Sequence, residues 1–169
     1  AEVTGSQWKT ANTASTGADS LSDGNANTTA LLGDPAHVMA GLCAAYTGGG
    51  YTDWYMPSLA EYQLVYTNRA EIGSVLGLLN QYNWTATSTA YAFGLLDSGY
   101  NGDSKTGYRS SRPVRRIPKI MPEVIPTTIG ETIAGGVYIG DVTIGSDVYA
   151  VVMSKEVPIA GKQWKTSAT

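Results

Sequence analysis

The sequence is poor in cysteine, histidine and charge. Cys43 is the single cysteine and His37 the single histidine among 169 residues. An intrachain disulfide is therefore excluded, and so is a zinc site built from cysteine and histidine. Charged residues make up 15% of the chain, against about 25% in ordinary globular proteins. The net charge of -3 gives no field that would attract nucleic acid or an anionic membrane, so neither partner is expected.

Small polar residues and tyrosine replace the missing charge. The chain has 20 glycines and 11 tyrosines but a single phenylalanine, and 43% of its residues are hydrophobic. That hydrophobic content is too high for a disordered chain, and the length fits one ordinary domain. No apolar run approaches the roughly 18 residues of a membrane span. The mixture favours an all-β or α+β protein on a virion or cell surface over a cytosolic helical enzyme.

One six-residue segment occurs twice. GSQWKT at residues 5–10 is echoed by GKQWKT at residues 161–166, and Glu-Val precedes both, at residues 2–3 and 156–157. The spacing is too long for a solenoid repeat. The echo indicates an array of whole domains, or a unit that passes its last strand to a neighbour.

Three helices are predicted. Asp34 is positioned to cap the first, with Pro35 as its first residue. Its apolar stripe comprises Val38, Met39, Leu42 and Tyr46. Ser58 and Glu61 form the capping box of a second helix that runs to about residue 68. A third helix is expected within residues 70–80, whereas residues 10–35 are predicted to be a loop with one turn at residues 23–24.

Strands are expected after these helices in the sequence. Residues 83–89 and 108–117 are β-like. Prolines at 118, 122 and 126 indicate an extended linker. Beyond it, residues 137–144 and 148–153 flank Gly-Ser-Asp and predict a β-hairpin.

Three motifs together resemble a known family. They are GYTDWYMPS at residues 50–58 with Glu61, YNWTAT at residues 82–87 and RPVR at residues 112–115. In order and spacing they resemble a C-type-lectin-like domain family of uncharacterised function, found in bacteriophage tail-fibre and bacterial surface proteins. Met56 stands where that family usually has leucine, and the hairpin that normally precedes the Gln-Trp-Lys-Thr segment follows the domain here.

The resemblance implies an α+β fold with a C-type-lectin-like domain over residues 1–117. Residues 118–130 are then a proline-rich linker, and residues 131–169 a hairpin segment that pairs with its own or a neighbouring subunit. A lone two-stranded hairpin is marginally stable in water, so it is expected to dock. The expected role is a non-enzymatic structural and binding module of a virion, cell surface or extracellular filament.

The expected ligand-binding surface is rich in tyrosine, which gives contact area at low entropic cost. A glycan or protein receptor is the expected ligand. We name this set the Tyr-rich surface: Tyr91, Phe93, Tyr100, Asn101, Asp103 and Tyr108.

A second set of residues is expected to mediate self-assembly. An alternative function is accordingly a purely structural subunit that polymerises head-to-tail by donating its C-terminal strands. The assembly residues are Trp8, Val137, Ile139, Val148, Val151 and Trp164.

Catalysis and metal binding are not predicted. A carbohydrate-active enzyme is the third alternative, but His37 on a helix and one cysteine offer no catalytic set, and no cofactor is expected. Oxygen atoms of Asp97, Asn101 and Asp103 could still donate to calcium. The cluster Arg109, Arg112, Arg115, Arg116 and Lys119 is interpreted as salt-bridging rather than as a nucleic-acid site.

Overall fold

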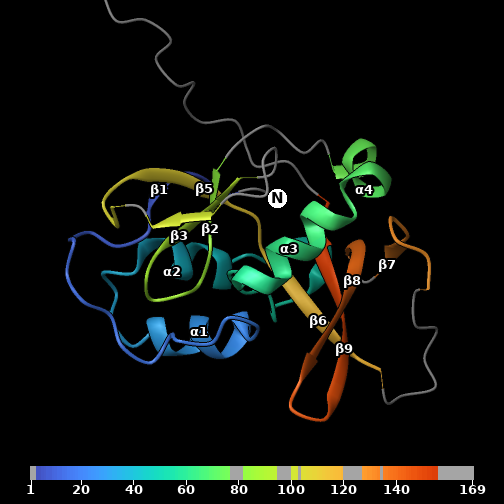
Figure 1. The fold of residues 1–169 in the computed structure, drawn as a ribbon, viewed down its shortest axis with the longest axis horizontal. Coiled ribbons are helices and arrows are strands. Elements are labelled where there is room, and N and C mark those ends of the chain that lie inside the picture. The colour runs from blue at the N-terminus through green and yellow to red at the C-terminus, as the bar shows by residue number, and fades with distance from the viewer. Residues whose placement is uncertain are drawn as a thin grey trace, which may run out of the picture.

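Helices and two sheets make up the computed structural model, which describes residues 3–76, 82–94, 100–102, 104–119, 127–133 and 135–155. Its helical elements are α1 (Gly24–Leu31), α2 (Val38–Ala44), the short η1 (Gly48–Gly50), α3 (Leu59–Thr67) and α4 (Arg69–Leu76). Figure 1 shows α1 and α2 beside one sheet and α3 and α4 beside the other. The α+β class expected from the sequence is confirmed.

The first sheet has five strands in the order β1-β5-β2-β3-β4. They are β1 (Val3–Gln7), β2 (Tyr82–Trp84), β3 (Tyr91–Gly94), β4 (Tyr100–Gly102) and β5 (Tyr108–Ser111). Neighbouring strands in this sheet run antiparallel, except that β2 and β5 are parallel.

The second sheet is antiparallel in the order β6-β9-β8-β7. It contains β6 (Val114–Pro118), β7 (Thr132–Ile133), β8 (Gly136–Ile144) and β9 (Asp147–Ser154). The predicted hairpin is confirmed as β8 and β9, which pair from Ile144 opposite Asp147. Gly145 takes a φ of 62° in the turn, a conformation that suits glycine.

The prediction of one strand over residues 108–117 is wrong. Arg112 and Pro113 separate β5 from β6, and the two strands join different sheets. Proline has no N–H for a strand ladder. The Arg112 N–H donates instead to the Tyr62 hydroxyl at 2.9 Å, and the Pro113 carbonyl accepts from the N–H of Ser154 at 3.2 Å. These two residues form the connection through which the chain passes from the first sheet to the second.

Helix α1 lies where the sequence predicted only a loop and a turn. The Asp23 carboxylate caps it by accepting from the Ala26 N–H at 2.9 Å. The helix predicted from Asp34 also begins later, at Val38. Asp34 uses its side chain in a turn, accepting from the Ala36 N–H at 2.9 Å.

Helix α2 buries a different stripe from the one expected. Met39, Ala40 and Cys43 are buried, whereas Leu42 is 43% exposed. Met39 and Cys43 are four residues apart and therefore lie on the same face of the helix, with Ala40 beside them.

Helix α3 begins with the predicted capping box. The Ser58 hydroxyl accepts from the Glu61 N–H, and the Glu61 carboxylate accepts from the Ser58 N–H at 2.8 Å. The same carboxylate accepts from the Tyr55 hydroxyl at 2.6 Å and is fully buried. The box therefore fixes both the start of α3 and the segment that precedes it.

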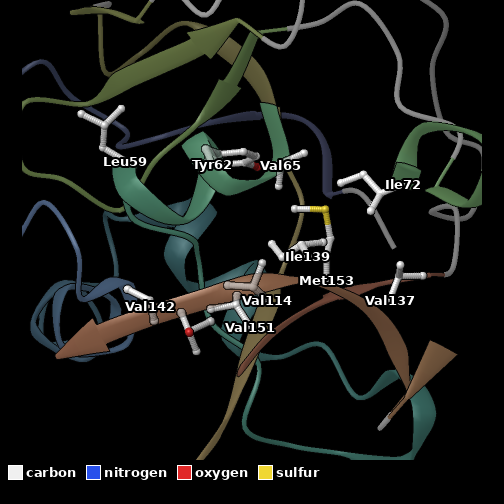
Figure 2. Packing of buried hydrophobic residues seen from close by; sticks show 11 residues of the cluster. Leu59, Tyr62, Val65, Ile72, Val114, Val137, Ile139, Val142, Val151 and Met153 are labelled. Carbon is white, nitrogen blue, oxygen red and sulfur yellow. The ribbon is translucent and has the colours of Figure 1, made fainter. Parts of the chain in front are cut away.

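One hydrophobic cluster joins the hairpin to α3. Figure 2 shows side chains of α3 facing those of β8 and β9. Its buried members are Tyr55, Leu59, Tyr62, Val65, Ile72, Val114, Val137, Ile139, Val142, Val151 and Met153. The hairpin packs on its own chain in this structure, and the boundary expected after residue 117 falls inside β6, which pairs with β9.

A second cluster lies between the five-stranded sheet and the first two helices. Trp8 and Trp84 are its largest side chains and are almost completely buried. The Trp8 indole donates to the Thr85 carbonyl at 2.8 Å. The Trp84 indole donates to the Ser6 carbonyl at 3.2 Å. These bonds attach β1 and the residues after it to the rest of the body.

Candidate functional site

The Tyr-rich surface is distributed over three strands of the five-stranded sheet. Tyr91 and Phe93 lie in β3, Tyr100 and Asn101 in β4, and Tyr108 in β5. Tyr100 is the register partner of Phe93 across the β3–β4 pair. The sheet thus places the backbones of these three strands in one layer, with β2 between β3 and β5, while Asp103 lies outside the described residues.

Tyr108 is the exposed aromatic of this set whose side chain the structure describes. It is 57% exposed and stands opposite Gln7 on β1. The turn before it is fixed from two sides: the Gly107 N–H donates to the Ser104 carbonyl at 2.8 Å, and the Gln7 side-chain amide donates to the Thr106 carbonyl at 3.1 Å. Tyr108 is therefore presented on a positioned backbone.

Lys105 covers the edge of the core next to this turn. Its ammonium lies 4.8 Å from the Trp8 ring centroid. Its backbone N–H donates to the Asn12 side-chain oxygen at 3.5 Å, and its carbonyl accepts from the Lys9 N–H at 2.9 Å. Burial, followed by the nearby charge of Lys9, lowers the pKa of Lys105. The side chain also donates to the Thr13 carbonyl at 3.0 Å, so it ties the first loop to the sheet.

A serine and the single histidine form a contact that the sequence did not reveal. The Ser15 hydroxyl lies 2.8 Å from His37 Nε2, and His37 Nδ1 lies 3.1 Å from the Asp34 carbonyl oxygen. The carbonyl can only accept, so Nδ1 carries a proton, and in the neutral ring Nε2 accepts from the Ser15 hydroxyl. Ser15 and His37 are 22 residues apart, and no motif connects them.

The order of these groups is that of an imidazole-activated nucleophile, but their surroundings favour an anchor. The Asp34 carboxylate is 3.7 Å from Nδ1, and the Ala36 N–H and then Lys9 hold the pKa of that carboxyl below its usual value. Lys105 donates to the Ser15 hydroxyl at 3.3 Å. Lys9 donates to the Ala14 carbonyl at 3.0 Å, so every partner in this group fastens the same loop.

The basic cluster is largely paired with carboxylates, as predicted. Arg115 makes a bidentate pair with Asp53 at 2.8 and 2.9 Å. Arg116 pairs with Asp23 and Lys119 with Asp141. These cations join β6 and the residue after it to other parts of the fold.

The predicted assembly residues are mostly buried within their own chain. Trp8, Val137, Ile139 and Val151 are 1% exposed or less, whereas Val148 is 38% exposed. Trp164 lies outside the described residues. Assembly through the four buried side chains would require part of the fold to open.

The described residues offer neither a metal-binding cluster nor a membrane-spanning helix. Those residues contain no group of three His, Cys, Asp or Glu side chains that could hold a metal ion. Of the suggested calcium donors, Asn101 lies in β4, and Asp97 and Asp103 fall outside the described ranges. No helix among the described residues is long and apolar enough to cross a bilayer.

Comparison with known proteins identifies no relative. No family model, curated protein or solved structure matches the chain. The fold is mixed helix and sheet, and any finer assignment rests on the residues themselves.

Proposed function

We propose that this chain is a non-enzymatic binding and structural module of a phage fibre or an extracellular filament. It has a C-type-lectin-like fold in this proposal and recognises a glycan or protein through the Tyr-rich surface. Its place is then on a virion or a cell surface.

The observation that supports binding is the presentation of Tyr108. A tyrosine exposed over half of its surface loses apolar contact with water when a ligand covers it, and its hydroxyl can still hydrogen-bond. Its turn is held by Gln7 and by an internal hydrogen bond. A preorganised aromatic of this kind binds with little loss of conformational entropy.

The groups most suited to catalysis have structural partners. His37 and Ser15 fasten a loop, and Cys43 is a buried thiol in the second cluster. These contacts favour the binding function over a carbohydrate-active enzyme.

Binding can be tested with the double variant Tyr100→Ala and Tyr108→Ala. Purified bacterial surface polysaccharides on an array, and whole bacterial cells, are the probes. The wild-type chain is expected to bind a subset of them, and the double variant to lose about tenfold or more in affinity, since two aromatic contacts each contribute more than about 1 kcal/mol. Protease treatment of the cells separates a protein receptor from a glycan.

Tyr51→Ala is the matched control. Tyr51 is 37% exposed but stacks on Arg115 of β6, away from β3, β4 and β5. This variant is expected to bind like the wild type. Unchanged attachment of the double variant would show that the Tyr-rich surface is not the binding site, and release of cleaved polysaccharide would favour the enzyme.

The structural alternative also has support, but not through donation of the hairpin. β9 is paired with both β6 and β8, and β8 also pairs with β7. Donating β8 and β9 together to a neighbour would break the β6–β9 and β7–β8 pairs and expose the cluster under α3. Exchange of a segment outside this core would break fewer contacts than donation of the hairpin.

A further inference from the structure

The repeated segment has a defined role in its first copy. Residues 5–10 and 161–166 share five of six amino acids. In the first copy, the Gln7 side chain donates to the Thr106 carbonyl, and Trp8 donates to the Thr85 carbonyl while its ring fills the second cluster. The repeated side chains are therefore those through which this segment binds the rest of the domain.

The rest of the copy makes contacts of the same kind. The N–H of Lys9 donates to the Lys105 carbonyl, and its ammonium lies 3.3 Å from the Asp34 carboxylate. The N–H of Thr10 donates to the Ala36 carbonyl at 2.9 Å. We name the acceptors of residues 7–10, together with the cavity occupied by the Trp8 ring, the Trp8 site.

The one position that differs is compatible with the same site. Ser6 and Lys162 occupy it in the two copies. Ser6 accepts the Trp84 indole through its backbone carbonyl, and a lysine supplies the same group. Residues 161–166 therefore carry every group through which the first copy is seen to bind.

Residues 1–169 carry two copies of the segment, and among the described residues the first copy fills the Trp8 site. The geometry points to a second partner: we infer that residues 161–166 bind the Trp8 site of a second copy of this chain, after that copy's β1 has left it. Exchange of identical elements replaces contacts one for one and is thermodynamically inexpensive. Because β1 is covalently linked to the rest of its own chain, its effective concentration at the Trp8 site is high. The exchange therefore requires β1 to leave that site first.

This inference rests on the structural part of the proposed function and not on the Tyr-rich surface. A chain that fails to exchange strands can still bind polysaccharide. The two ideas can thus fail separately.

The first test opens the site in the full chain with Trp8→Ala. Light scattering is expected to show dimers or larger species of this variant, because Trp164 of one chain enters the vacated site of another. The matched double variant, Trp8→Ala with Trp164→Ala, is expected to be monomeric. Equal masses with and without Trp164 would overturn the inference. A monomer whose Tm still depends on Trp164 would also overturn it, since the copy would then fill its own body.

A second test keeps Trp8 and so does not depend on the folding of that variant. Ser6 pairs with Arg109 across β1 and β5, so Lys162, its equivalent, should reach Arg109 of another molecule. The pair Arg109→Cys and Lys162→Cys is expected to give disulfide-linked dimers on oxidation. Cys43 is buried and does not compete. Arg109→Cys with Lys155→Cys is the control, and equal dimer yields from the two pairs would exclude the exchange.

Discussion

Two buried acids show how single residues are held in this protein. Burial raises the pKa of both Cys43 and Glu61. Glu61 accepts hydrogen bonds from Tyr55 and Ser58, which lower its pKa again, together with the charge of Arg116. The charged form of Cys43 is stabilised less. Burial raises the pKa of Cys43 from 9.0 to about 12, and a hydrogen bond with Ser111 opposes the shift only in part. Its thiol is thus kept protonated by the fold.

The thiol is expected to be inert at pH 8 and to make stability depend on alkaline pH. A disulfide reagent should modify Cys43 in urea but not in the native chain, because the thiolate is the nucleophile. The native pKa exceeds the unfolded one, so the stabilisation is complete below pH 9 and is lost as the pH rises toward 12.

Urea denaturation measures the alkaline effect, with Cys43→Ala as the reference. The unfolding free energy of the wild type should fall more steeply between pH 8 and pH 11 than that of the variant. Tyr55, whose pKa is also raised, contributes equally to both chains. Parallel pH profiles, or rapid modification of the native thiol, would contradict this account.

At the scale of elements, α1 depends on contacts made outside the helix. The Thr28 hydroxyl donates to the Met56 carbonyl at 3.2 Å and accepts from the Met56 N–H at 3.1 Å. Gly24 is equally constrained, since a Cβ there would lie 2.5 Å from a Glu61 oxygen. Side chains of α1 thus bond the extended segment that leads into α3.

Replacing Thr28 with valine is expected to destabilise the chain by about 2 kcal/mol, because both polar groups of Met56 lose a buried partner. Thr29→Val is the matched control, as its side chain is exposed on the same helix and the substitution has the same effect on helix propensity. Thermal unfolding followed by circular dichroism compares them. Equal Tm values for the two variants would show that the Met56 contacts contribute nothing.

The elements that could be predicted are those with local signals. The Ser58 and Glu61 box determines the start of α3, and Gly145 with Ser146 closes the hairpin. Helix α1 has the sequence GNANTTAL, in which glycine, asparagine and threonine favour helix weakly. Predicting this helix would have required knowing that Thr28 bonds Met56. The break at Pro113 was predictable in principle from the missing N–H, but the change of sheet was not.

The candidate site was predictable only in part for the same reason. Tyrosine composition located the segments that become β3, β4 and β5, but not their order in the sheet. The role of Trp8 in the core depends on Thr85, far along the chain. Ser15 and His37 meet through the packing of a loop, which leaves no signal in the sequence.

At the scale of the whole molecule, the hairpin forms part of the main core rather than an appendage. Met153 on β9 and Tyr62 on α3 belong to one buried cluster. Deleting residues 121–169 would expose the face of α3 and the edge of β6. Loss of assembly after such a deletion would therefore not by itself show strand donation.

Met153→Ala is expected to lower the unfolding free energy by about 3 kcal/mol through the cavity it leaves. Tryptophan fluorescence, which reports mainly the cluster of Trp8 and Trp84, should shift together with circular dichroism. Val148→Ala is the control on the same strand, since Val148 is 38% exposed. A fluorescence midpoint unchanged by Met153→Ala would show that the two halves unfold independently.

The break between β5 and β6 also determines how the molecule bears tension. Val3 begins β1 opposite Ser111, and β9 ends with Met153 opposite Val114 and Ser154 bonded to Pro113. The chain thus enters and leaves the body at one junction. A pull between these points is expected to act first on the pairs at residues 111–114, and to separate β1 from β5 and β9 from β6 one pair at a time.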